Sequence, residues 1–202
     1  AESEPWIIDL GLMNYNEQDR NTGLEFLLNA ERGLEDGGAL NLAFELDVIT
    51  GATPNGASSS NVPQTFTMAS GIGVYSADAN ELPADDTHMD IRMALKAALT
   101  EPLSEDVDIE YNGLLSMEFD YLAMAGGVSL ATDFNQKNTT LITAINLEYD
   151  RVHPVGNIPI ALANVQPAGG VQPRTVSSTS KRIQEYSFGI NQVLDRRSLL
   201  QL

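Results

Sequence analysis

Apolar and polar residues alternate strictly in two runs of the chain, residues 22–31 and 40–48. Every second position in these runs is apolar: Leu24, Phe26, Leu28, Ala30, Leu40, Leu42, Phe44, Leu46 and Val48. Successive side chains of a β-strand point to opposite faces, so this period predicts two strands, each with one apolar and one polar face. The stretch between them, residues 32–38, is rich in Gly and Asp, as expected for a hairpin turn.

Similar alternation predicts further strands along the chain, at residues 6–15, 65–75, 88–99, 107–119, 122–134, 139–149 and 184–193, with another beginning at Ser198. Residues 88–99 are ambiguous, because their Met, Ala, Leu and Lys residues favour a helix whereas their alternation favours a strand. We expect a strand here, closed by Pro102, because its neighbours are strands. The sequence therefore predicts an all-β protein of about nine consecutive strands, arranged most simply as an antiparallel up-and-down meander.

The predicted connections differ in length. Short polar turns lie near Asp19, Asp120 and Asn135, whereas residues 50–63, 76–87 and 151–181 form long loops. A sheet of many strands must close or stack to hide its edges. Long loops at one end and short turns at the other are typical of outer-membrane β-barrels, so we expect the meander to form part of a transmembrane β-barrel.

The apolar strand faces need either lipid or a protein core against them. Several strands extend for about 10–12 residues, which is longer than usual in globular sheets and suits a tilted membrane crossing. Aromatic residues fall often at strand ends, as in an interfacial girdle: Trp6, Tyr15, Tyr75, Tyr111, Phe119, Tyr121, Phe134 and Tyr149. The alternative is a soluble sandwich or jelly roll whose apolar faces pack together.

Charge and composition narrow the partners. The 202 residues include no cysteine and carry a formal net charge of −17, which excludes disulfides and thiolate sites and speaks against nucleic-acid binding. Acids and a few bases occupy the polar strand faces, and in a barrel they would line the lumen: Glu25, Glu45, Asp47, Asp90, Arg92, Lys96, Glu110, Glu118 and Glu148. A water-filled lumen of this kind favours small cations or other small solutes.

Candidate catalytic and metal-binding groups are weak in this sequence. The cluster of acids and one histidine at residues 85–90 matches no known metal-binding spacing, so we interpret it as a solvated loop. His153 and the serines of residues 177–180 lack the Gly-x-Ser-x-Gly elbow of a serine hydrolase. Glu118 and Asp120 are two apart on one predicted strand face, but a charged lumen explains them without a glycosidase pair. We therefore expect no enzyme, no metal and no cofactor.

Several stretches together carry a family resemblance: residues 50–57, 116–121, 133–140, 150–156 and 192–197. With them, the whole chain resembles an uncharacterised family of proteobacterial proteins known only as a domain of unknown function. The resemblance implies a signal peptide and an outer-membrane β-barrel in a Gram-negative bacterium. The start at Ala1 without Met fits an end left by signal-peptide removal. Because family members continue beyond Leu202, the resemblance also implies that residues 1–202 form the N-terminal portion of a single barrel domain.

The expected function is an outer-membrane β-barrel in the lipid bilayer, porin-like, acting as a pore or as a scaffold whose long loops meet a protein partner. The alternative is a secreted soluble β-sandwich that acts as a binding or structural module.

Overall fold

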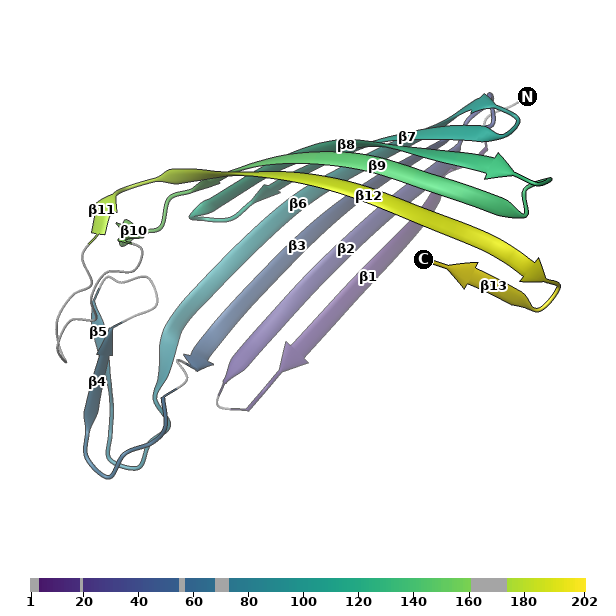
Figure 1. Cartoon of the computed structure of the whole chain (residues 1–202). Coiled ribbons are helices and arrows are strands. Elements are labelled where there is room, and N and C mark those ends of the chain that lie inside the picture. Colours follow the sequence, from purple (N-terminus) through teal and green to yellow (C-terminus); the bar gives the residue numbers. More distant parts are fainter. Residues whose placement is uncertain (1–3, 19, 55–56, 68–72, 161–173) are drawn as a thin grey trace.

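One large antiparallel sheet dominates the computed structural model, which describes residues 4–18, 20–54, 57–67, 73–160 and 174–202. Its nine strands, in spatial order, are β1 (Ile7–Asn16), β2 (Asn21–Gly33), β3 (Ala39–Pro54), β6 (Ala84–Ser104), β7 (Val107–Met117), β8 (Tyr121–Phe134), β9 (Thr139–Val152), β12 (Thr179–Asp195) and β13 (Ser198–Gln201). Each strand pairs with the next in this order, so the prediction of an all-β antiparallel meander is confirmed. Figure 1 shows the strands as a tilted, curved sheet with β1 and β13 at its two edges. No helix within the described ranges is long and apolar enough to cross a membrane.

Two short hairpins lie outside the large sheet. β4 (Gln64–Thr67) pairs with β5 (Val74–Ala77), and β10 (Ile158–Pro159) pairs with β11 (Arg174–Val176). The prediction of one strand over residues 65–75 is therefore wrong. Gly73 has a φ of 85°, which no extended strand contains, so the backbone turns just before β5.

β6 is a strand throughout and is longer than predicted. β6 pairs with β3 from Ala84 to Thr100, which resolves the helix–strand ambiguity of residues 88–99 in favour of the strand. It also continues through Pro102 to Ser104, so the expected end at Pro102 is wrong. A register shift between Pro102 and Ser104 accommodates the proline, because a bulge interrupts the ladder where the missing N–H would have paired.

The connections sort by length between the two ends of the sheet. One end, here called the short-turn end, holds only the tight connections at residues 34–38, 105–106, 135–138 and 196–197. The other end, the loop end, holds two short turns at residues 17–20 and 118–120 and the long segments 55–83 and 153–178. The expected contrast between the two ends is thus present, although the turns near Asp19 and Asp120 lie at the loop end.

The two faces of the sheet differ in chemistry. The register aligns the apolar positions of neighbouring strands on one face, for example Leu28, Phe44, Leu95, Leu115, Met124 and Tyr149 in a single row. The side chains of this row are exposed or half-buried, and others on the same face are more exposed, up to 74% for Leu12 and 79% for Phe188. The buried apolar side chains of the described part of the chain are those of Ala77, Pro83, Ala94 and Ala123. No second layer covers this apolar face in the described ranges, so the sheet has no core of its own there.

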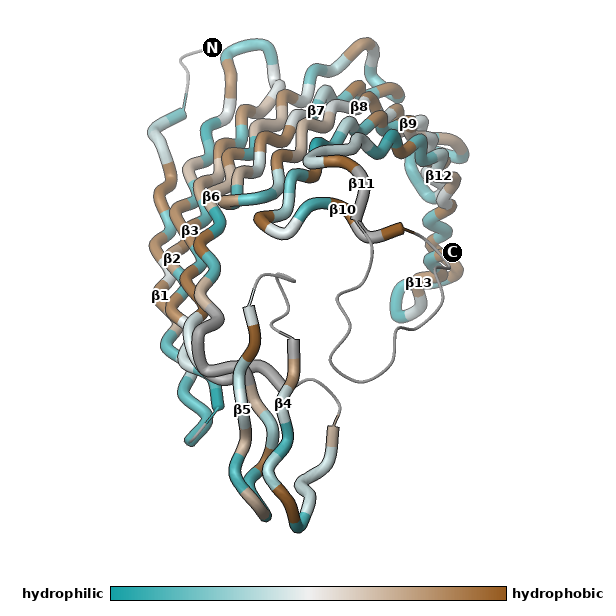
Figure 2. The backbone as a smooth tube through the Cα atoms, turned by 90° about the vertical axis from the view of Figure 1, so that its left-hand side faces the viewer, coloured by the Kyte–Doolittle hydropathy of each residue, from teal (hydrophilic) through white to brown (hydrophobic). Residues whose placement is uncertain are grey.

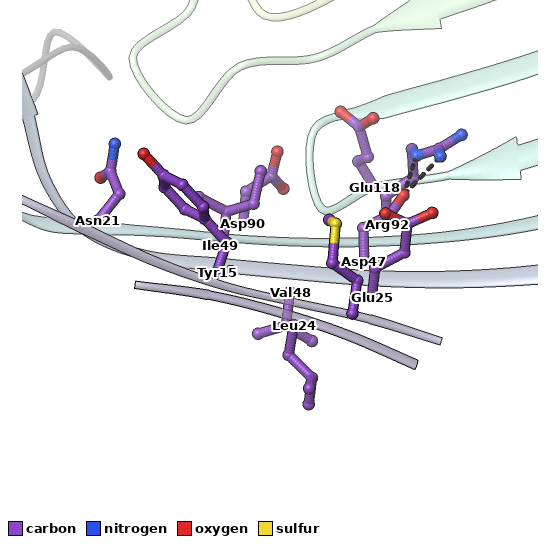
Figure 3. A pocket seen from close by; sticks show the side chains of 12 residues that line it. Tyr15, Asn21, Leu24, Glu25, Asp47, Val48, Ile49, Asp90, Arg92 and Glu118 are labelled. Carbon is purple, nitrogen blue, oxygen red and sulfur yellow. Dashed lines mark hydrogen bonds and ion pairs between the residues drawn. The ribbon is translucent and has the colours of Figure 1, made fainter. Parts of the chain in front are cut away.

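The other face is polar and lies on the concave side of the sheet. Figure 2 shows the sheet as an arch with β10 and β11 beneath it. In Figure 3, Asp47, Arg92 and Glu118 converge on one side of the strands, whereas Leu24 and Val48 point to the opposite side. Curvature crowds the concave side chains, which explains why small residues such as Ala94 are almost fully buried there.

Candidate functional site

The charged residues of the concave face form the candidate site. Strand register places all but one of the predicted site residues on this face: Glu25, Glu45, Asp47, Asp90, Arg92, Lys96, Glu110 and Glu148. Glu118 is the exception, because β7 ends at Met117 and Glu118 begins the β7–β8 turn. The expectation that Glu118 and Asp120 share a strand face is therefore wrong, and both belong to this turn.

A network of ion pairs joins β3 to β6 at the centre of this face. Asp47 and Arg92 are direct cross-strand partners, and the Arg92 Nε donates to Asp47 Oδ2 at 2.6 Å. The second arm of the guanidinium reaches Glu45 Oε2 at 3.1 Å, and Lys96 Nζ lies 2.5 Å from Glu45 Oε1. Cross-strand pairs of opposite charge stabilise a sheet modestly, and here they also fix the positions of two acids and two bases.

An open hollow of about 550 Å³ lies beside the ion pairs, toward the loop end. The carboxyl groups of Glu25, Asp47, Asp90 and Glu118 line it, with Arg92 as the only cation among its lining residues. Figure 3 shows Glu118 reaching over this hollow from the β7–β8 turn. Acids outnumber bases here, so the hollow has a negative potential that attracts cations.

The pKa of Glu118, in the β7–β8 turn, is raised by its surroundings. Partial burial raises the pKa of its carboxyl group above the usual glutamate value, and the carboxylates of Asp90 and Asp120 raise it further. The guanidinium of Arg92 acts in the opposite direction, but less strongly. Glu118 is thus a carboxyl group beside the hollow that gains a proton more readily than an ordinary glutamate.

A second cluster joins β8, β9 and β12 on the same concave face. The Tyr121 hydroxyl donates to Asp150 Oδ2 at 2.5 Å, and Lys181 Nζ lies 2.8 Å from the same oxygen and 2.8 Å from the Tyr121 hydroxyl. Asp150 is completely buried, and its Oδ1 has no hydrogen-bond partner among the described residues. Sequence reasoning missed these three residues, because the cross-strand pairing of Asp150 with Lys181 depends on which strands become neighbours.

One register row links the two clusters across the sheet. Glu45 pairs with Ala94, and the row continues through Ser116 and Ala123 to Asp150. The three side chains between the acids are small and buried. The three strands β6, β7 and β8 therefore separate the acids, and they place only small side chains between them in this row.

The remaining candidates form no catalytic or metal site in the described structure. The side chains of Asp85, Asp86 and His88 lie outside the described residues, and elsewhere in the described ranges no three His, Cys, Asp or Glu residues group around a metal position. His153 shares a hollow with Ser177 and Ser178, but no hydrogen bond joins its imidazole to either hydroxyl in this part of the structure.

Comparison with known proteins identifies a family for this chain. A family model described as "Protein of unknown function (DUF3570)" matches residues 1–202. None of the curated proteins and none of the solved structures that were compared matches the chain.

Proposed function

We propose that this chain, which belongs to the DUF3570 family of proteins of unknown function, forms part of the wall of an outer-membrane β-barrel with a cation-favouring lumen. The observation that carries the proposal is the uncovered apolar face of the nine-stranded sheet. In water, a contiguous apolar face of this extent has no stabilising partner. In a bilayer, lipid chains cover it.

The height of the apolar band agrees with a membrane crossing. On the outward face, apolar residues extend from Leu40 to Val48 on β3, from Met89 to Leu99 on β6 and from Val107 to Met117 on β7. These stretches match the ~9–11 residues that a tilted strand needs to cross the hydrocarbon layer.

The band also crosses the register rows obliquely. The row that contains Met93 is apolar up to Leu122 on β8 but continues with Arg151 on β9 and Ser180 on β12. The row that contains Glu101 on β6 continues with Ile109 on β7, Leu130 on β8, Thr143 on β9 and Phe188 on β12, so it is mostly apolar only beyond β6. The band therefore moves toward the short-turn end as the sheet is followed from β6 to β12. Strands tilted by about 35–45° in a flat bilayer produce this drift.

The concave face gives the proposed lumen its character. Its acids outnumber its bases around the hollow described above, and the chain as a whole carries a net charge of −17. A pore lined in this way concentrates small cations and repels anions. A secreted β-sandwich would instead need a second apolar layer over β1 to β12, and the described residues contain none.

Our second proposal is that the sheet is a scaffold that presents its long loops to a protein partner, and a separate observation supports it. β3 and β6 stay paired as far as Pro54 and Ala84, whereas the pairing of β6 with β7 stops at Met93. The two strands thus extend as a ribbon beyond the rest of the loop end toward β4 and β5 (Figure 1). Such a ribbon suits contact with a protein partner.

The absence of cysteine allows a direct test of which face meets lipid. Leu46→Cys and Glu45→Cys place spin labels at adjacent positions on opposite faces of β3 in the full-length native protein, reconstituted into lipid vesicles. We expect oxygen, which concentrates in the hydrocarbon, to relax the label at residue 46, and a water-soluble nickel chelate to relax the label at residue 45. Equal access of the nickel chelate to both labels, or recovery of the folded protein without detergent, would overturn the membrane proposal.

A further inference from the structure

Two arginines stand side by side on the outward face near the loop end of β9 and β12. Arg151 pairs with Ser180 across the ladder, and Arg182 pairs with Tyr149, so the arginines are diagonal neighbours on one face. Diagonal positions of this kind are about 7–8 Å apart, close enough for two guanidinium groups to contact one anion. Both side chains are exposed.

These arginines have no acidic partner within the described ranges. The chain holds 28 acids and only 11 lysines and arginines, and Arg92, Lys96 and Lys181 all contact carboxylates on the concave face. The ion pairs of the described chain include neither Arg151 nor Arg182. Asp120 in the nearby β7–β8 turn accepts from the His153 N–H through its carbonyl oxygen at 2.8 Å, and its carboxylate is in none of these ion pairs.

A hollow of about 540 Å³ with a mixed polar and apolar lining adjoins Arg151. His153, Ser177 and Ser178 contribute an imidazole and two hydroxyl groups to its lining, and Leu122 contributes an apolar side chain. Guanidinium, imidazole and hydroxyl donors are the groups that recognise phosphate oxygens.

The position of the hollow relative to the apolar band indicates the kind of phosphate. Leu122 and Tyr149 lie at the edge of the band, and Tyr149 is next to Arg182 across the ladder. An anion held by Arg151 and Arg182 would therefore have Leu122 beside it in the register row of Arg151 and the aromatic ring of Tyr149 on its short-turn side. This arrangement fits an amphiphile with a phosphate above and acyl chains below, and a free anion would leave those apolar contacts unused.

We propose that Arg151 and Arg182, with the adjoining hollow, bind the phosphate of an anionic lipid headgroup. The inference rests on the proposed membrane barrel and adds a lipid class and a position to it. The acyl chains of the lipid lie over Leu122 and Tyr149.

The test uses the full-length native protein in nanodiscs that contain equal amounts of phosphatidylglycerol and phosphatidylcholine. Native mass spectrometry after release from the nanodisc counts the lipids that stay bound. We expect retention of phosphatidylglycerol by the wild type and about 30-fold weaker retention by the Arg151→Gln/Arg182→Gln variant, because each arginine near the surface contributes about 1 kcal/mol toward anionic lipid and 1.4 kcal/mol is about tenfold in affinity. The matched control is Arg196→Gln/Arg197→Gln, which removes two exposed arginines from the short-turn end and should retain phosphatidylglycerol.

Three outcomes would overturn the inference. One is equal retention of both lipids by the wild type. Another is equal loss of phosphatidylglycerol from the test and control variants, which would indicate only net charge. The third is displacement of the lipid by inorganic phosphate alone, which would indicate a site for free phosphate. Heat-modifiable gel mobility of the same samples separates this inference from the membrane proposal, because a folded, inserted barrel without lipid preference refutes the inference alone.

Discussion

Lys181 lies directly opposite Asp150 across the β9–β12 ladder, and its ammonium group is 2.8 Å from the Oδ2 of a carboxylate that is completely buried. The Tyr121 hydroxyl donates to the same oxygen. The three residues therefore tie β8, β9 and β12 together where the long segment 153–178 leaves the sheet.

Removing the lysine should destabilise the sheet through the charge that it leaves behind. In Lys181→Met, the Asp150 carboxylate loses its cationic partner, and an unpaired buried charge is costly. We expect the temperature of the heat-modifiable mobility shift to fall, and the further change Asp150→Asn to recover about half of the loss, because it removes the charge itself. Lys137→Met is the control, because its contact with Asp133 is long, 3.8 Å, and exposed. If the losses of stability from Lys181→Met and Asp150→Asn simply add in the double variant, the two side chains are not directly coupled.

Glu118 should make cation selectivity depend on pH. Its pKa is raised in the folded protein, so the carboxyl group still holds its proton at pH values where an ordinary glutamate, with a pKa of about 4.3, has lost it. Cation preference in planar-bilayer recordings should therefore increase as the pH rises through this higher pKa, and Glu118→Gln should abolish that step. Glu110→Gln, on the concave face of β7 but outside the lining of the hollow, should leave the step in place.

The same carboxyl group has a matching effect on stability. Because the folded state holds the proton more tightly than the unfolded chain, the unfolding free energy falls as the pH rises between the two pKa values and is lowest above the folded-state value. Glu118→Gln should flatten this dependence. A wild-type stability that rises over this pH range would contradict the assignment.

An arginine introduced on the outward face should destabilise the protein more than one introduced on the concave face. Leu95 is 53% exposed on the outward face and touches no covering layer, so Leu95→Arg should cost about 2–4 kcal/mol only when lipid surrounds it. Ser129→Arg on the concave face lies opposite Glu110 and should be tolerated. Urea unfolding of both variants in lipid vesicles measures the difference. Equal costs at the two positions would argue against a bilayer around the sheet.

Replacing Gly127 with any residue that has a side chain should destabilise the sheet. A Cβ atom at this position would lie 1.8 Å from the Asn146 Oδ1 and 2.8 Å from the Ile145 carbonyl oxygen, so the neighbouring strand would have to move. We expect Gly127→Ala to cost about 1–3 kcal/mol, as overpacking usually does. Gly113→Ala is the matched control, because its Cβ would meet nothing closer than 3.9 Å. Asn146→Ala should relieve only part of the cost, since the Ile145 backbone oxygen remains.

The faces of the strands were predictable from the sequence, whereas the partners across the sheet were not. The opposite orientation of Leu24 and Glu25 follows from a period of two within one strand, which is a local property. The contact between Asp47 and Arg92 depends on β3 and β6 being neighbours, across 45 residues of chain that include β4 and β5. Alternation alone does not specify that register.

The same limit explains the residues that sequence reasoning missed. Asp150, Lys181, Arg151 and Arg182 are unremarkable within their own segments, and β12 begins at Thr179, before the predicted start at residue 184. Their significance arises only when β9 and β12 pair. The break between β4 and β5 was missed for a different reason, because a glycine in an alternating run also fits a weak strand.

The scarcity of buried apolar side chains has a consequence for how the protein acquires its structure. A sheet whose described residues bury little more than a few alanines gains almost no hydrophobic free energy from its own collapse in water. In the proposed membrane barrel, lipid contacts on the apolar face supply the stabilisation that a hydrophobic core supplies in other proteins. If the chain forms the proposed membrane barrel, folding and insertion into the bilayer are one thermodynamic step, and before that step the open strand edges must be kept from pairing with those of other molecules.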